Sequence, residues 1–291
     1  MNVNMNFKKK ILNLSDIQKN YDSFFIDLWG VIHNGIELFP GVLNVLNNLK
    51  NNNKDVLFIT NAPRRNYIIK EQLKDFGIFE SLYKDIISSG EVSWLNMKKK
   101  ISVEKNKLHC FHIGPPRDDH LTKDLKIIIT KDPNKADFVL NTGPWGDNDK
   151  LENYTKILCI LSQLDIPMIC SNPDKTVIRG NNSMICAGLL AEFYENQGGK
   201  VEYFGKPHSE IYEKCFSVIG KKKVKEKILV IGDSLSNDIQ GAINEKLDSL
   251  LVTSGIHREV NKDNLIDIKK LNDLMKKKKI FPSFAISKLI W

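Results

Sequence analysis

The sequence predicts an α/β protein whose parallel sheets are covered by helices on both faces. Three observations point to this class. Short, almost continuously apolar runs recur along the chain, and amphipathic helix-like segments separate them. Strands of a parallel sheet are buried on both faces, so they are apolar throughout. The 291 residues correspond to about two domains, which is enough chain to bury a sizeable core.

The predicted strands are the apolar runs 23–29, 55–60, 108–113, 136–142, 166–171, 201–205, 227–232 and 249–255. The predicted helices, with apolar residues on one face, cover 42–50, 65–77, 89–100, 151–164, 188–199 and 208–220. Because strands and helices alternate along the chain, we expect doubly wound sheets of the Rossmann-like kind.

The composition indicates a globular protein with a solvated, basic surface. Hydrophobic residues make up 42% and charged residues 27%, and the net charge is +8. Lysine clusters at 8–10, 98–100, 221–223 and 276–279 are dispersed and lack interleaved aromatic residues and glycines. A nucleic-acid surface would show such interleaving, so no nucleic-acid partner is expected. The positive field would help to gather anionic substrates.

The cysteines and the apolar segments predict a cytoplasmic protein. Five cysteines lie far apart, without a CxxC pair, which indicates reduced thiols rather than disulfides or a zinc site. The basic N-terminal patch is followed by an apolar run too short for a signal peptide. No apolar run approaches the length of about 18 residues that a membrane span needs, so no membrane partner is expected.

Polar residues stand at the carboxyl ends of four predicted strands. Asp27, Thr60 with Asn61, Lys206 and Asp233 each follow an apolar run. Ligands of doubly wound sheets bind beyond these strand ends. Any one of these residues alone would be an ordinary strand-end residue. Two carboxylates, a hydroxyl group and an amine in this order predict a site for an anion and a metal ion.

The same segments resemble the motifs of the haloacid dehalogenase (HAD) superfamily of phosphotransferases. Its first motif, Asp-x-Asp-Gly-(Val/Thr), is represented by "DLWGV" from Asp27 onward, and its second, a Thr or Ser, by Thr60. Its third, a lysine, is represented by Lys206 in "FGKP", and its acidic fourth motif by "GDSLSND" with Asp233 and Asp238. The resemblance spans nearly the whole chain, and the fourth motif is its most specific part.

Three further segments, "CSNPDKTVIRG", "AGLLAEFYENQGG" and "FGKPHSEIY", resemble class IIA of the superfamily. This class contains phosphatases of the p-nitrophenyl phosphatase, pyridoxal phosphatase and phosphoglycolate phosphatase types. The resemblance implies a Rossmann-like core at 16–85 and 199–291 with an inserted α/β cap domain at 86–198. It also implies a small phosphorylated metabolite as substrate and a homodimer formed through the cap. "DLWGVIHNG", "VTSGIHRE" and the tail "LIW" are similar to one bacterial branch of the class.

The resemblance implies roles for the acidic residues. Asp27 would be the nucleophile, forming an aspartyl-phosphate that water then cleaves. Mg²⁺ would be held by Asp27, by the backbone carbonyl of Trp29 and by Asp233. Asp238 would hold a metal-bound water.

Further residues would contact the phosphate group or the substrate. Thr60 and Asn61 would donate hydrogen bonds to phosphate oxygens, and Lys206 would neutralise the nucleophile and the transferring group. The backbone amides of Trp29 and Gly30 would cradle the remaining oxygens. In the cap, Asn172 and Asp174 of "SNPDKT" would help to choose the substrate; a purely structural turn is an equal alternative. The segment 114–120, "GPPRDDH", is expected to be a turn.

Trp29 stands where the superfamily's phosphatases carry a second aspartate, which protonates the leaving group. General acid–base catalysis contributes roughly 10²–10⁴ in rate. Three hypotheses follow. The protein is a phosphatase whose leaving groups need little protonation, or which uses His33 as a replacement acid. Alternatively, it is a binding or regulatory protein with little turnover. A dehalogenase, the third hypothesis, is disfavoured because Asp233 and Asp238 would repel Asp27 without a cation.

Overall fold

The computed structural model describes residues 9–179, 182–220 and 224–291. Lys8 and the lysines at 221–223, which belong to the predicted charge clusters, lie outside these residues. The chain forms two compact units. Unit 1 comprises the residues up to Thr60, Lys70–Ile87 and Tyr212–Trp291, and unit 2 comprises Asn61–Ile69 and Ser88–Ile211.

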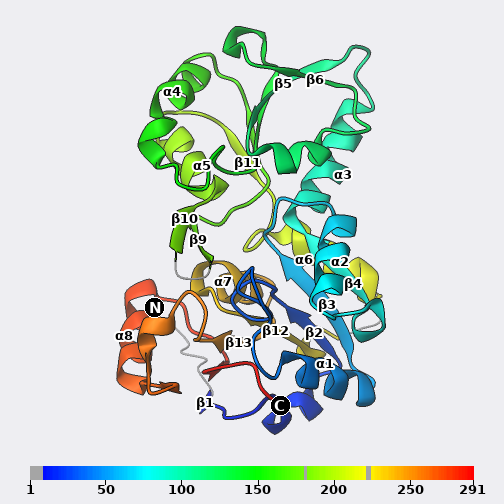
Figure 1. The fold of residues 1–291 in the computed structure, drawn as a ribbon, viewed down its shortest axis with the longest axis vertical. Coiled ribbons are helices and arrows are strands. Elements are labelled where there is room, and N and C mark those ends of the chain that lie inside the picture. Colours follow the sequence, from blue (N-terminus) through cyan, green and yellow to red (C-terminus); the bar gives the residue numbers. More distant parts are fainter. Residues whose placement is uncertain (1–8, 180–181, 221–223) are drawn as a thin grey trace. The chain divides into compact units, whose positions relative to one another are not determined.

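Unit 1 contains a sheet of seven strands among the described residues. Their order is β1 (Lys9–Lys10), β16 (Phe284–Ile286), β13 (Asp248–Val252), β12 (Ile228–Gly232), β2 (Ser23–Ile26), β3 (Asp55–Thr60) and β4 (Asp85–Ser88). The central strands run parallel: β12 pairs with β13 and β2, and β2 pairs with β3 (Figure 1). All residues of β2 and β12 are buried. The predicted fold class, a parallel α/β sheet with a Rossmann-like core, is confirmed.

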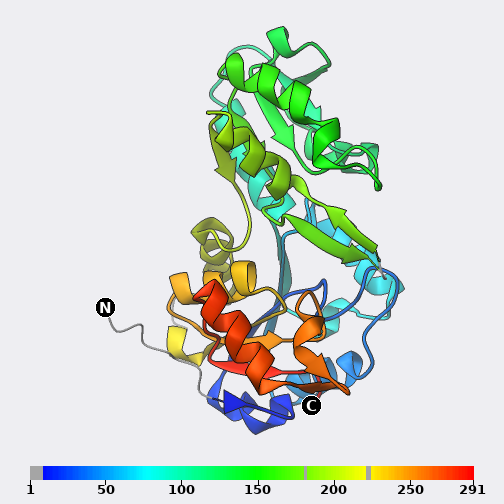
Figure 2. The same cartoon turned by 90° about the vertical axis from the view of Figure 1, so that its left-hand side faces the viewer.

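The helices that lie wholly in unit 1 are α1 (Val42–Asn51), α7 (Gln240–Asn244) and α8 (Ile268–Lys278), while α2 (Asn66–Asp75) and α6 (Ser209–Ile219) begin in residues of unit 2 and continue in unit 1. One π-helical turn, η8 (Leu235–Ile239), precedes α7 directly. Helix α8, in orange-red in Figure 2, packs Leu271 and Met275 into a cluster with Leu251 of β13 and Ala285 of β16. Short 3₁₀ turns lie at Leu14–Asp16, Gln18–Asn20, Glu80–Leu82, Lys225–Lys227 and Arg258–Val260, and a two-stranded ribbon is formed by β14 (Asn261–Lys262) and β15 (Leu265–Ile266).

Unit 2 contains a five-stranded sheet in the order β11 (Val201–Tyr203), β8 (Met168–Cys170), β7 (Phe138–Asn141), β5 (Leu108–Ile113) and β6 (Ile127–Thr130). All of its strand pairs are parallel. Its helices are α3 (Ser89–Ile101), α4 (Thr155–Gln163) and α5 (Ala187–Asn196). Leu158 of α4 and Leu190 of α5 share one core with Val139 of β7. An antiparallel hairpin joins β9 (Thr176–Arg179) and β10 (Asn182–Ile185), and 3₁₀ turns lie at Pro116–Leu121, Pro133–Lys135 and Leu151–Asn153.

The end of unit 2 differs from the predicted domain boundary between residues 198 and 199. Strand β11 pairs with β8, with Val201 opposite Met168, so the chain stays with unit 2 as far as Ile211. The run "VEYFG" predicts a strand, but the strand's partner is set by a long-range pairing that the local sequence does not encode.

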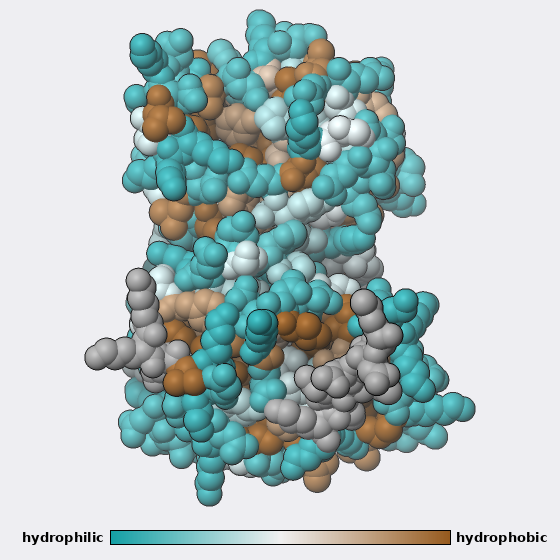
Figure 3. All heavy atoms as spheres, turned by 180° about the vertical axis from the view of Figure 1, so that it is seen from behind, coloured by the Kyte–Doolittle hydropathy of each residue, from teal (hydrophilic) through white to brown (hydrophobic). Residues whose placement is uncertain are grey.

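The surface supports the expectation of a solvated exterior. On the face shown in Figure 3, hydrophilic side chains cover most of both units, and hydrophobic ones form separate patches. Among the described residues, no helix has both the length and the apolar character needed to pass through a lipid bilayer. All five cysteines are free thiols.

The segment 114–120 forms the 3₁₀ turn Pro116–Leu121 after β5 and contains a buried carboxyl group. Asp118 is only 2% exposed, and its Oδ1 has no hydrogen-bond partner among the described residues. Burial raises the pKa of Asp118 to about 6, although the charges of Arg64 and Arg117 and a hydrogen bond with Thr142 act in the opposite direction. The charged form of this carboxylate is therefore unfavourable in the folded protein.

Asp118→Asn is expected to stabilise the protein more as the pH rises. The ordinary pKa is 3.8 and the folded value is about 6. Between these values the folded state keeps a proton that the unfolded state has lost, so the contribution of Asp118 to stability falls with rising pH. At about 1.4 kcal/mol per pKa unit, the variant should gain roughly 2–3 kcal/mol relative to wild type between pH 4 and pH 7.5. Urea unfolding at both pH values measures this change.

The exposed Asp124 provides the control for this prediction. Asp124→Asn makes the same change in charge in the same unit, so it reports the general effect of removing a carboxylate, and the rise with pH should be larger for Asp118→Asn. A flat difference for Asp118→Asn would show that the Asp118 carboxyl group titrates normally in the folded state.

Candidate active site

The neighbouring strands β2 and β12 bring Asp27 and Asp233 together. Asp27 directly follows β2, and its backbone N–H donates to the carbonyl of Ile231 in β12 at 2.8 Å. Asp233 directly follows β12, and Thr60 is the last residue of β3, on the other side of β2. Since these strands are parallel, their carboxyl ends lie at the same edge of the sheet.

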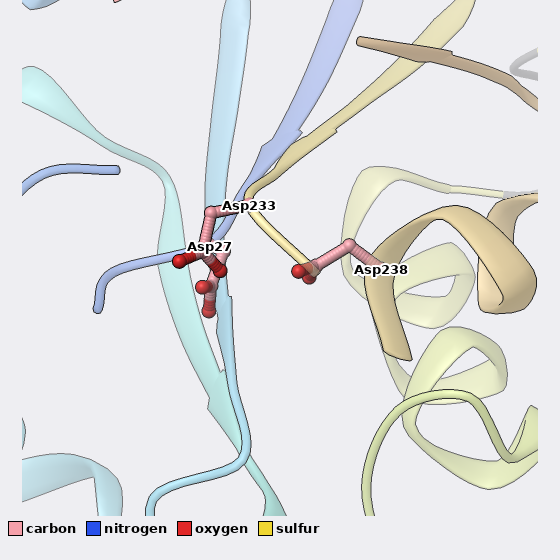
Figure 4. A group of neighbouring side chains, drawn as sticks. All are labelled: Asp27, Asp233 and Asp238. Atoms are coloured by element: carbon pink, nitrogen blue, oxygen red, sulfur yellow. The ribbon is translucent and has the colours of Figure 1, made fainter. Parts of the chain in front are cut away.

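Asp238 completes a cluster of three carboxylates. One carboxylate oxygen from each of Asp27, Asp233 and Asp238 lies within 4.8 Å of the others, and all three residues are buried. Figure 4 shows the side chains of Asp27 and Asp233 next to each other and that of Asp238 pointing toward them from η8. A π-helical turn is a rare element that often lies at functional sites.

Backbone amides hold two of these carboxylates in place. Oδ2 of Asp233 accepts a hydrogen bond from the backbone N–H of Ile256 at 2.8 Å, and Oδ2 of Asp238 accepts one from Ser234 at 3.0 Å. The side chain of His257 also fixes η8, because its Nε2 accepts from the backbone N–H of Leu235 at 3.3 Å. Three buried carboxylates at this distance repel one another unless a cation or protons compensate their charge. An all-oxygen donor set of this kind suits a hard divalent cation.

Asp233 is enclosed between two glycines. A Cβ atom built on Gly30 or on Gly255 would overlap Oδ2 of Asp233, and Gly30 has a φ of +82°. Side chains are therefore excluded from both positions, and Gly30 also needs the left-handed conformation that glycine adopts most easily. Gly30 belongs to the first sequence motif, whereas Gly255 and Ile256 lie outside all four motifs. Their signal was a glycine at the end of a predicted strand, in "VTSGIHRE".

The amide of Gly30 does not match its predicted role as a phosphate donor. Its N–H donates to the carbonyl of His33 at 2.9 Å, so this amide stabilises the loop itself. Gly30 serves instead to let the loop approach Asp233 closely.

Trp29 and His33 pack against each other within the same loop. Their ring centroids lie 5.3 Å apart in an edge-on arrangement, and the His33 ring also lies 5.2 Å from that of Phe76. His33 is only 3% exposed, and its Nδ1 accepts a hydrogen bond from Gly35 at 3.0 Å. These contacts describe a histidine that stabilises the loop. They give no direct support to the predicted role of His33 as a replacement acid.

In unit 2, Asn61 fixes the backbone of Lys206. Oδ1 of Asn61 accepts from the N–H of Lys206 at 2.7 Å, and Nδ2 donates to the carbonyl of Lys206 at 3.0 Å and to Oδ1 of Asp174 at 2.7 Å. Both amide hydrogens of Asn61 are thus used, which disagrees with its predicted role as a phosphate donor. Asn61 is instead a positioning residue for the buried Lys206, whose own role with the transferring group stays a prediction.

The segment "SNPDKT" forms a turn, which is one of the two alternatives that the sequence leaves open. Oδ1 of Asn172 accepts from the backbone N–H of Asp174 at 3.0 Å, which forms an Asx turn. A role of these two residues in substrate choice stays a prediction. The predicted site residues thus fall into two groups: Asp27, Trp29, Gly30, His33, Thr60, Asp233 and Asp238 on unit 1, and Asn61, Asn172, Asp174 and Lys206 on unit 2.

The fold and the carboxylate cluster define a Rossmann-like α/β protein with an acidic site beyond its central strands. The family model of haloacid dehalogenase-like hydrolases matches residues 24–127, and a second, HAD-hydrolase-like model matches residues 203–274. A solved hydrolase of the haloacid dehalogenase-like family from Brucella suis 1330 is 30% identical, with a TM-score of 0.82 over 96% of this chain and 100% of that one. The chain belongs to the haloacid dehalogenase-like hydrolase family.

Two further relatives have specific names. The acid sugar phosphatase of Staphylococcus epidermidis is 22% identical over 240 residues, covering 82% of this chain and 88% of that protein. The 4-nitrophenylphosphatase of Schizosaccharomyces pombe is 25% identical over 265 residues, covering 82% and 86%. Both names are consistent with the class IIA assignment.

Proposed function

We propose that the protein is a Mg²⁺-dependent phosphatase that hydrolyses a small phosphomonoester through an aspartyl-phosphate on Asp27. The carboxylate cluster of Asp27, Asp233 and Asp238 is the observation that carries this proposal. The names of two relatives, an acid sugar phosphatase and a 4-nitrophenylphosphatase, support the choice of phosphomonoesters as the substrate class.

The cluster suits the cation that the proposal requires. Asp27 and Asp233 would hold Mg²⁺ directly together with the backbone carbonyl of Trp29, because replacing a side chain leaves that carbonyl in place. Asp238 would orient a water ligand. The bound cation would supply positive charge that offsets the buried carboxylates and the phosphate oxygens.

The chain itself supplies the nucleophile. A carboxylate oxygen of Asp27 attacks phosphorus while the bond from phosphorus to the leaving oxygen breaks, and water then cleaves the aspartyl-phosphate to release inorganic phosphate and restore Asp27. The hydroxyl group of Thr60, at the end of the strand next to β2, would donate to a phosphate oxygen. The indole ring of Trp29 cannot protonate the leaving oxygen as an aspartic acid would.

The missing proton donor predicts a strong dependence on the leaving group. We expect kcat/KM for 4-nitrophenyl phosphate to exceed that for simple alkyl phosphates by about 10²-fold or more, the usual contribution of general acid catalysis. The reason is that 4-nitrophenolate leaves without protonation near neutral pH, whereas an alkoxide needs a proton. Release of phosphate from a panel of both ester types, with Mg²⁺, measures this ratio.

His33→Ala separates the remaining hypotheses. Because His33 contacts Trp29, Phe76 and Gly35, this variant should lower stability but leave the ratio between the two ester types within about twofold. A selective loss of alkyl phosphate hydrolysis would instead assign proton delivery to His33. Equal rates for both ester types in wild type would contradict the missing-acid explanation. Tight binding of phosphate compounds without turnover by wild type would contradict the phosphatase proposal itself.

A further inference from the structure

Unit 1 contains a cavity of about 330 Å³ whose walls come from three separate segments. Val31 and Phe39 belong to the loop after Asp27, Ser254 and Arg258 follow β13, and Lys288 follows β16. Asp27, Asp233 and Asp238 are not among the described residues that line it. The cavity is therefore separate from the carboxylate cluster, and its volume is in the range of small-molecule sites.

The charge of this cavity is positive. Arg258 and Lys288 are exposed side chains in its wall. Of the described residues that line the cavity, none is acidic, and neither cation forms a salt bridge within the described part of the chain. A guanidinium and an ammonium group without an acidic partner offer charge-assisted hydrogen bonds to an anion.

The remaining wall combines polar and apolar groups. Ser287 and Asn264 supply hydrogen-bonding side chains, while the buried Val31 and Leu289 and the half-buried Phe39 form an apolar part. Asn261 also lines the cavity, but its amide already bonds the hydroxyl and the carbonyl of Thr253 at 2.7 and 3.0 Å. It thus serves as a fixed part of the wall rather than as an adaptable donor.

We propose that this cavity binds a small organic anion that carries a phosphate or carboxylate group on an apolar or ring-containing body. The anionic group lies against Arg258 and Lys288, and the apolar portion lies against Val31, Phe39 and Leu289. This site is additional to the proposed phosphatase site, and binding there involves no chemical step.

The cavity shares its walls with the loops that enclose Asp233. Val31 directly follows Gly30, and Ser254 directly precedes Gly255, and both glycines lie against the Asp233 carboxylate. The backbone N–H of Ile256, next along the second loop, donates to the same carboxylate. An anion that bridges Val31 and Arg258 therefore fixes both loops that position Asp233.

Calorimetric titration of the whole 291-residue chain with phenylphosphonate, in buffer with Mg²⁺, tests the proposal. The variant Arg258→Gln/Lys288→Gln should bind phenylphosphonate at one site fewer than wild type, or its affinity at the cavity should fall at least about 10-fold. This is the loss expected when two charge-assisted contacts are removed. Lys276→Gln/Lys277→Gln removes the same charge from the exposed end of α8 and should keep both the number of sites and the affinity. Benzyl alcohol, which lacks the charge, should not occupy the site.

A parallel titration with benzoate distinguishes carboxylates from phosphates. Wild type should bind one of the two ligands, benzoate or phenylphosphonate, more tightly than the other. This difference in affinity should disappear in Arg258→Gln/Lys288→Gln. Equal stoichiometry and affinity for wild type and this variant would overturn the proposal. Equal weakening in both double variants would also overturn it, because that result would report only the general field of the protein. Since no turnover is measured, these outcomes do not depend on the phosphatase proposal.

Discussion

Asp27→Asn is expected to lower hydrolysis of 4-nitrophenyl phosphate by about 10⁴-fold or more, the scale on which loss of an enzymatic nucleophile acts. An amide oxygen is a poor nucleophile and cannot form the aspartyl-phosphate. The substitution keeps the size of the side chain, so the sheet should remain folded. Steady-state kinetics with Mg²⁺ measures the loss, and mass spectrometry after a rapid acid quench should detect a phosphorylated wild-type protein but no such species for the variant.

Asp22→Asn is the matched control for this loss. Asp22 is an exposed residue just before β2, at the other end of the strand from Asp27, and its replacement should leave kcat/KM within about twofold. Substantial turnover by Asp27→Asn would mean that another group attacks phosphorus, and it would remove the basis of the proposed mechanism.

Asp233→Asn is expected to weaken Mg²⁺ binding at least about 100-fold, since even residues that only support metal ligands cost 10–100-fold. The variant removes one of the charges in the cluster while keeping an oxygen that can accept from Ile256, as Oδ2 of Asp233 does. Activity should fall with metal occupancy and should recover in part at high Mg²⁺ concentration. Calorimetric titration with Mg²⁺ measures the affinity directly.

Asp273→Asn, on the exposed part of α8, makes the same change in charge outside the cluster and should bind Mg²⁺ like wild type. Treatment with EDTA should reproduce the loss of activity in wild type, and added Mg²⁺ should reverse it. Unchanged Mg²⁺ affinity in Asp233→Asn would contradict the assignment of this carboxylate as a metal ligand.

The sequence predicted most strands of the two main sheets and missed others. "DVLFIT" and "LHCFHI" form β3 and β5 over the predicted residues. In these sheets β1, β4, β6 and β16 were not predicted, and neither were the strands of the two-stranded ribbons β9–β10 and β14–β15. β6, "IIIT", is an edge strand with exposed isoleucines, and β16 is only three residues long. Such strands depend on their neighbours in the sheet more than on their own composition.

The sequence predicted the positions of site residues that stand at the end of a strand. It did not predict the role of a side chain where that role depends on the residues that the side chain contacts in the folded protein. The positions of Asp27 and Asp233 follow from parallel strands ending at one edge. The hydrogen bonds of Asn61 to Lys206 join residues 145 positions apart. The burial of His33 and the clamp of Gly30 and Gly255 on Asp233 likewise arise from tertiary packing, which a local pattern does not contain.

The shared loops of Gly30–Val31 and Ser254–Gly255 have a thermodynamic consequence. If an anion in the cavity changes the affinity of the carboxylate cluster for Mg²⁺ by some factor, Mg²⁺ must change the affinity of the cavity for that anion by the same factor. The two sites would then form a reciprocal pair. A rise in the concentration of either ligand would change how much of the other is needed to fill its site, without any direct contact between the two.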